Sequence, residues 1–219
     1  MMRPLCIVQA RMGSTRLPGK VMMEVKGKPL IWYLTERFTL SVDRGYVDNY
    51  IFALPAIARQ DALGSYLLQR CHPNRVIFAE EEMNVAGRFA AVLARFPCDT
   101  FIRICADSPL LDPAVIDAAV TLYQPPYFQL HCSVGSVEVV DTGEFLRGLP
   151  KMDAVQREHV TGFVRRSYDR VFYFGDEWPE QRLVVDTAED FQRVKSVIEK
   201  MTRPHMEYGW RECLALLSS

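Results

Sequence analysis

Short, continuously apolar runs alternate with amphipathic stretches along the first half of this chain, and this alternation restricts the fold more than any other sequence feature. The first run covers residues 5–8, and similar runs cover 50–54, 76–79 and 100–104. Runs without polar alternation are typical of parallel strands buried on both faces. The expected helices between them cover 29–38 and 61–71, and further helices begin at 84 and 112. The sequence therefore predicts an α/β fold: a three-layer, Rossmann-like arrangement with a mostly parallel central sheet.

The pattern changes in the second half of the chain. We expect an insertion at about 129–175 that adds antiparallel strands and covers the site or forms a dimer interface. Its strand-like pieces are 129–132, 137–140 and 171–174, around helices at 142–149 and 157–167. After it, 182–185 is expected to return to the sheet, followed by helices at 188–201 and 207–217. No internal repeat or low-complexity linker occurs, so residues 1–219 predict a single domain.

Composition excludes several classes of protein. The chain has 219 residues, of which 49% are apolar and 24% charged, as in folded soluble domains and unlike disordered or coiled-coil chains. Its apolar runs are shorter than the roughly 18 residues of a membrane helix, and residues 9–11 interrupt the first run too early for a secretory signal. The six cysteines form no CxxC pair, which predicts free thiols in a reducing cytoplasm and no structural zinc.

The charge is unevenly distributed. Residues 1–28 carry six basic groups and one acid, a net charge of +5, although the whole chain has a net charge of −1. A broad nucleic-acid-binding face would raise the charge of the whole domain. The asymmetry instead predicts a local anion site and no nucleic acid among the partners. The short apolar runs predict no membrane partner.

The loop at 9–20, directly after the first apolar run, is the most informative segment. It holds Arg11, Arg16 and Lys20 together with Gly13 and Gly19. Glycines let backbone N–H groups approach an anion closely, and the cations supply charge-assisted donors, as a triphosphate site requires. The spacing does not fit a Walker P-loop, and no GxGxxG fingerprint is present. An exposed basic loop without a ligand is the alternative interpretation.

Segment 10–20, with the sequence ARMGSTRLPGK, resembles the signature loop of the sugar cytidylyltransferases. The group includes the CMP-Kdo and CMP-acylneuraminate synthetases, and the resemblance is strongest to the SpsF group, named for spore coat polysaccharide biosynthesis. The resemblance implies the nucleotide-diphospho-sugar transferase (GT-A-like) fold. It continues in the same order along the chain, at 27–30, 103–110, 137–139, 157–161 and 182–190.

The resemblance implies an enzyme: a nucleotidyltransferase that joins CTP to a sugar acceptor, expected to be acidic, and releases pyrophosphate. Arg11 and Lys20 are the implied catalytic residues, with both side chains on the phosphates. The implied nucleotide-binding residues are Ala10, Arg11, Gly13, Ser14, Arg16, Lys20 and Asp107. A homodimer is implied by the family alone.

Two aspartates, Asp107 and Asp186, each follow an expected strand, and a parallel sheet can bring both to one edge. Mg²⁺ commonly binds one or two carboxylates and completes its shell with phosphate and water oxygens. The resemblance likewise implies that these two aspartates hold the catalytic Mg²⁺ as cofactor. The alternatives are a loop cap for Asp107 and a helix N-cap for Asp186.

Three further residues are candidates for the site, and two of them have a second interpretation. Glu138 and His159 match family segments on the sugar side, but His159 is equally well interpreted as a packed residue at a helix start. Arg88 lies where the family places a helix beside the nucleotide, or it is an exposed helical arginine.

Departures from the family keep other functions open. Segment 53–61 lacks the usual Thr/Ser-rich turn, so another nucleotide, UTP or GTP, is an alternative substrate. A catalytically silent sugar-nucleotide-binding homologue is a second alternative. A glycosyltransferase of the same fold would need a DxD motif, and 107–109 is not one.

Overall fold

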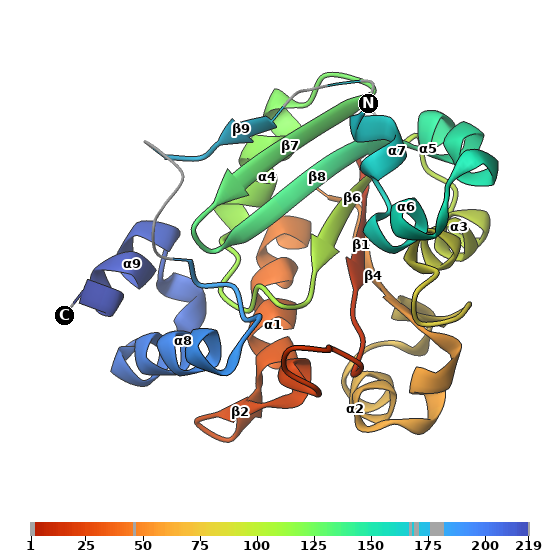
Figure 1. Ribbon diagram of the computed structural model, residues 1–219. Helices are drawn as coiled ribbons and strands as arrows, with labels where there is room; N and C mark the ends of the chain where they lie inside the picture. Colours follow the sequence, from red (N-terminus) through yellow and green to blue (C-terminus); the bar gives the residue numbers. More distant parts are fainter. Residues whose placement is uncertain (1–2, 46, 167, 169–170, 176–181, 219) are drawn as a thin grey trace.

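A seven-stranded sheet forms the centre of the computed structural model, which describes residues 3–45, 47–166, 168, 171–175 and 182–218 (Figure 1). The strand order is β5-β4-β1-β6-β8-β7-β9. Its strands are β1 (Leu5–Gln9), β4 (Asn49–Leu54), β5 (Val76–Phe78), β6 (Thr100–Cys105), β7 (Tyr127–Cys132), β8 (Gly135–Asp141) and β9 (Val171–Tyr173). A separate antiparallel pair consists of β2 (Glu24–Val25) and β3 (Lys28–Pro29).

The first half of the sheet is parallel. Strand β1 lies between β4 and β6, with Ile7 opposite Ile51 on one side and Arg103 on the other, and β5 pairs with β4. Ile7 and Ile51 are fully buried, as expected for strands covered on both faces. Because the strands are parallel, their carboxyl ends meet at one edge, where ligands bind in open α/β sheets.

The second half of the sheet is mainly antiparallel. Strand β8 pairs antiparallel with β6 and with β7, whereas β9 is parallel to β7. The expected antiparallel pairing is therefore confirmed for β7 and β8 but not for β9. The pairing extends the sheet beyond β6 and places Glu138 directly opposite Arg103.

Helices cover both faces of the sheet and give three layers (Figure 1). Alternate residues of β1 enter two hydrophobic cores, with Cys6 and Val8 in one and Leu5 and Ile7 in the other. The first core includes residues of α1 (Leu30–Asp43), α2 (Ala62–Arg70), α4 (Pro113–Leu122), α8 (Ala188–Lys200) and α9 (Trp210–Ser218). The second includes residues of α3 (Val85–Arg95), α5 (Thr142–Gly148) and α7 (Gly162–Arg165), and α6 (Ala154–His159) packs on α3. Short 3-10 helices are η1 (Lys20–Met22), η2 (Ala56–Gln60), η3 (Pro73–Arg75), η4 (Leu149–Lys151) and η5 (His205–Glu207).

Two sequence predictions are wrong. Segment 182–185 is not a strand of the sheet. Leu183 and Val185 are buried, and their N–H groups donate to the carbonyl oxygens of Ser133 and Asp107, each at 2.8 Å, without forming a ladder. The expected helix at 157–167 is two helices, α6 and α7, because Val160 between them has a φ of 61°. Position 167 lies outside the described residues. No helix in the described part of the chain has the length and apolarity needed to span a bilayer.

Candidate active site

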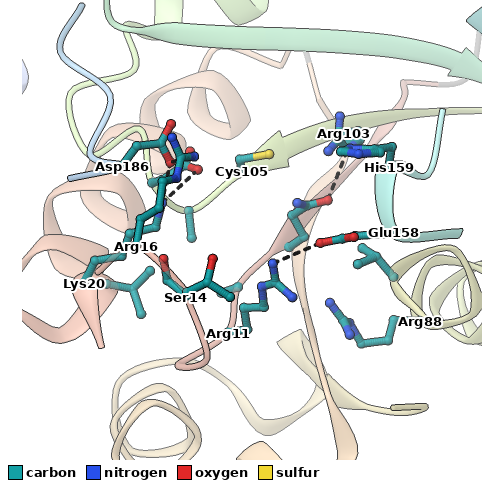
Figure 2. A pocket seen from close by; sticks show the side chains of 17 residues that line it. Arg11, Ser14, Arg16, Lys20, Arg88, Arg103, Cys105, Glu158, His159 and Asp186 are labelled. Atoms are coloured by element: carbon teal, nitrogen blue, oxygen red, sulfur yellow. Dashed lines mark hydrogen bonds and ion pairs between the residues drawn. The ribbon is translucent and has the colours of Figure 1, made fainter. Parts of the chain in front are cut away.

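A cavity of about 250 Å³ opens at the carboxyl edge of the parallel strands (Figure 2). The loop after β1 forms one side, and the start of α3, the end of β6 and the end of α6 form the others. Most predicted site residues line it: Ala10, Arg11, Ser14, Arg16, Lys20, Asp107, His159 and Asp186. Gly13 and Glu138 are not among the lining residues, and Glu138 instead lines a second cavity of about 180 Å³.

Backbone hydrogen bonds shape the loop after β1. The N–H groups of Ser14 and Gly19 both donate to the carbonyl oxygen of Met12, at 3.0 and 2.8 Å. Gly19 adopts the left-handed conformation, with a φ of 71°, which side chains disfavour and glycine tolerates. The reversal at Gly19 starts η1 and brings Lys20 back towards the cavity.

Lys20 joins the two predicted carboxylates. Its Nζ donates to Val185 O at 2.6 Å and to Asp186 Oδ1 at 2.9 Å, and it lies 3.4 Å from Asp107 Oδ2. The lysine side chain is 11% exposed. Arg16 Nη2 lies 3.0 Å from the same oxygen of Asp186 (Figure 2). Asp107 and Asp186 therefore converge on one cation, as the prediction of a shared site requires.

The donor set at this point fits a hard divalent cation with few protein ligands. Within the described residues, no group of three or more His, Cys, Asp or Glu side chains could hold a metal ion. Two converging carboxylates are, however, the number that Mg²⁺ commonly takes from a protein when phosphate oxygens supply further ligands. Asp107 and Asp186 are thus the residues that could hold such an ion.

Arg11 already has acidic partners. Its Nη2 lies 3.2 Å from Glu158 Oε1, and its Nη1 lies 3.9 Å from Glu82 Oε1 and 3.1 Å from Met83 Sδ. Glu158, at the end of α6, was within a recognised motif but had no predicted role. Its signal was the motif alone, because nothing in local spacing pairs residues 147 positions apart.

Arg88 is buried at the start of α3, with 1% of its surface exposed, so the interpretation as an exposed helical arginine is wrong. Its Nη1 donates to the carbonyl oxygens of Glu81 and Glu82, at 3.0 and 2.7 Å. Its Nε has no hydrogen-bond partner among the described residues. Burial, and then the charge of Arg11, lower the pKa of Arg88 to about 10, so it remains a cation at neutral pH. Because Arg88 lines the cavity, it adds positive charge beside Arg11.

Arg103 and Glu138 form a largely buried ion pair at the second cavity. Arg103 Nη1 donates to both carboxylate oxygens of Glu138, at 3.0 and 2.9 Å, and Arg103 Nε donates to Gln9 Oε1 at 3.0 Å. Gln129 Nε2 donates to Glu138 Oε1 at 3.3 Å. Arg103 lines both cavities, and so does Cys105, where burial raises the pKa of the thiol to about 12. Sequence reasoning gave Arg103 no role.

The end of α6 carries His159 to the cavity. His159 is exposed and is the last residue of α6, so it is neither packed nor at a helix start. Val160 follows with φ 61° and ψ −64°, and Thr161 N donates to His159 O at 2.7 Å. These values describe the rarer, strained form of the γ-turn. The turn ends α6 abruptly and leaves Glu158 and His159 at the cavity (Figure 2).

A family model for cytidylyltransferases matches residues 5–195, which includes the loop after β1 and both aspartates. The chain belongs to the cytidylyltransferase family. As a member of that family it is a nucleotidyltransferase, and the predicted resemblance is confirmed. It is similar to the spore coat polysaccharide biosynthesis protein SpsF of Bacillus subtilis, with 29% identity over 90% of this chain and 86% of that protein. It is also 32% identical to a 3-deoxy-manno-octulosonate cytidylyltransferase of Geobacter metallireducens, over 54% of this chain and 44% of that protein.

Solved structures of cytidylyltransferases share the fold. One from Leptospira borgpetersenii superposes with a TM-score of 0.77 at 21% identity, covering 100% of this chain and 94% of that one. A CMP-2-keto-3-deoxy-manno-octonic acid synthetase complexed with CTP gives a TM-score of 0.67 at 15% identity, covering 90% and 99%. The predicted nucleotidyltransferase fold of this cytidylyltransferase-family chain is therefore confirmed.

Proposed function

We propose that this protein is a Mg²⁺-dependent cytidylyltransferase that joins CTP to an acidic sugar, giving a CMP-sugar and pyrophosphate for surface polysaccharide synthesis. One observation carries the proposal: Lys20 of the loop after β1 meets Asp107 and Asp186 at one point of the cavity. A triphosphate site needs cations and donors for the phosphates beside carboxylates for a divalent ion. The CTP complex of a structural neighbour supports the choice of nucleotide.

Each site residue then has a role. Lys20 and Arg11 bind phosphate oxygens, and Arg16 is a further anion contact. Backbone groups near Ala10, Gly13 and Ser14 line the triphosphate. Asp107 and Asp186 hold Mg²⁺, which neutralises phosphate charge when bound. Positioning and charge neutralisation by such groups supply most of the catalysis in phosphoryl-type transfers.

The acceptor site is the second cavity. It shares Arg103, Cys105, Asp107 and Asp186 with the first cavity, so an acceptor placed there would lie next to a nucleotide bound in the first. Glu138 lines it, but its charge is compensated by Arg103, so Glu138 does not by itself exclude an anionic acceptor. His159, the other candidate for the sugar side, would contact the acceptor from the first cavity. The single domain and the homodimer stay predictions.

Pyrophosphate release tests this proposal. CTP, UTP, GTP and ATP are each incubated with Mg²⁺ and with a panel of acidic sugars, and thermal shifts are recorded in parallel. We expect a CTP-selective shift and pyrophosphate release with at least one sugar. Selectivity for UTP or GTP would show that the protein is a nucleotidyltransferase but not a cytidylyltransferase. If none of the four nucleotides binds, the proposal is refuted.

A further inference from the structure

We propose that Lys20 makes this site accept a divalent cation only together with a triphosphate, because the lysine is the counter-ion of the Asp107–Asp186 pair until phosphate draws it away. The inference deepens the proposed function and rests on it. It assigns the metal–triphosphate complex, instead of the free ion or the free nucleotide, as the ligand that the site takes up.

The contacts of Lys20 carry this argument. Three oxygen atoms surround its Nζ: Val185 O at 2.6 Å, Asp186 Oδ1 at 2.9 Å and Asp107 Oδ2 at 3.4 Å. The lysine side chain is 11% exposed, whereas the two aspartate side chains are 24% and 30% exposed. The ammonium group therefore lies on the inner side of the carboxylate pair, and all three contacts are made to oxygen.

A divalent ion alone meets a barrier at this place. An ion bound by both carboxylates would bring its charge close to the ammonium group, and charges of like sign repel strongly in a partly desolvated site. Among the described residues, Lys20 Nζ contacts no third acid, and its other hydrogen-bond partner is the backbone oxygen of Val185. Arg16, at 3.0 Å from Asp186 Oδ1, adds a second cation to be displaced.

A triphosphate removes that barrier. Its oxygens offer Lys20 and Arg16 charge-assisted hydrogen bonds that replace those to the aspartates. The carboxylates are then available to the cation, and the cation in turn neutralises the phosphates. By thermodynamic linkage, each ligand raises the affinity for the other by the same factor.

Binding of Mn²⁺ without nucleotide tests this inference, with free Mn²⁺ measured by electron paramagnetic resonance. We expect weak binding to the wild-type protein and binding about tenfold or more tighter to Lys20→Met, within the usual range of coupling between sites. Lys20→Arg keeps a cation and should stay weak. The matched control is Arg11→Met, which removes a cation from the same cavity but one that touches neither aspartate. Its Mn²⁺ affinity should change by less than about twofold.

A second variant guards against failure of Lys20→Met to fold. Arg16 is the other cation that contacts Asp186, and its side chain is exposed, so Arg16→Met should fold. We expect this variant to tighten Mn²⁺ binding by about threefold, less than Lys20→Met does. Equal Mn²⁺ affinities for wild type, Lys20→Met and Arg16→Met would overturn the inference. So would equal tightening by Arg11→Met, because the effect would then be general electrostatics. Either result leaves pyrophosphate release by the wild-type protein intact, whereas failure of the proposed function would abolish that release itself.

Discussion

Replacing Glu138 by Gln tests the ion pair between Glu138 and Arg103. The Glu138 and Arg103 side chains are 7% and 14% exposed, and Glu138 accepts two hydrogen bonds from Arg103 and one from Gln129. Glu138→Gln leaves the side-chain volume almost unchanged but removes the negative charge. The guanidinium of Arg103 then remains buried with its charge uncompensated.

The burial of this ion pair sets how much free energy of unfolding Glu138→Gln should remove. Removing one partner of a buried ion pair typically costs about 3–5 kcal/mol, because the other charge is left unpaired. The glutamine oxygen still accepts one hydrogen bond, so we expect the lower end, about 3 kcal/mol of unfolding free energy. In a chain of this size 1 kcal/mol shifts Tm by roughly 2–4 °C, which predicts a fall of about 6–12 °C.

Thermal and urea unfolding measure the effect, with two comparison variants. The double variant Arg103→Met/Glu138→Leu removes both charges, so it should be more stable than Glu138→Gln alone. Glu212→Gln breaks an ion pair with Arg203 whose N–O distance is 2.6 Å, but both side chains are about half exposed. Its Tm should hardly change. The reasoning would be refuted if Glu138→Gln lowered Tm by less than about 2 °C, or if the double variant were less stable than Glu138→Gln.

Three other predictions concern catalysis, pH and packing. Lys20→Ala should lower turnover at least roughly 100-fold and leave the circular dichroism spectrum unchanged. Near-wild-type turnover would show that Lys20 has no catalytic role. Burial lowers the pKa of His205 to about 4 from 6.5, so the unfolded chain binds more protons than the folded protein between these pH values. The free energy of unfolding should therefore fall as pH falls from 6.5 towards 4. Urea titrations of His205→Gln should show a smaller fall over the same pH range. Gly64→Ala would place a Cβ 1.9 Å from the backbone oxygen of Ala58 and should lower the free energy of unfolding by about 1–3 kcal/mol. In the control Gly162→Ala the new Cβ would have no described atom within 4 Å, so the stability should not fall.

The parallel half of the sheet could be predicted from the sequence because its strands are buried on both faces. The runs at 5–8 and 100–104 correspond to Leu5–Gln9 and Thr100–Cys105. Segment 182–185 has a similar composition but is not a strand. Two of its three apolar residues, Leu183 and Val185, are buried, but burial alone does not specify hydrogen-bonded pairing.

The candidate site could be predicted only in part. Segment 10–20 and the two aspartates carry motifs, and the structure brings Lys20, Asp107 and Asp186 together. The partners of Arg11 and Arg103 depend on how distant elements pack. Arg103 meets Glu138 because β6 and β8 are antiparallel in that register, which no local spacing encodes.

The charge asymmetry of the sequence has a structural counterpart in the cavity. Three cations from the first 28 residues, Arg11, Arg16 and Lys20, each lie within 4 Å of a carboxylate from the acidic remainder of the chain. The protein's own carboxylates thereby balance the charge of these cations, which avoids the repulsion that a cluster of unpaired cations would cause. The same pairing means that an incoming anion exchanges partners with the protein instead of meeting free charge. Under the proposed function, affinity for the nucleotide depends on which group then pairs with the released carboxylates, and for Asp107 and Asp186 a divalent cation is the partner whose chemistry fits.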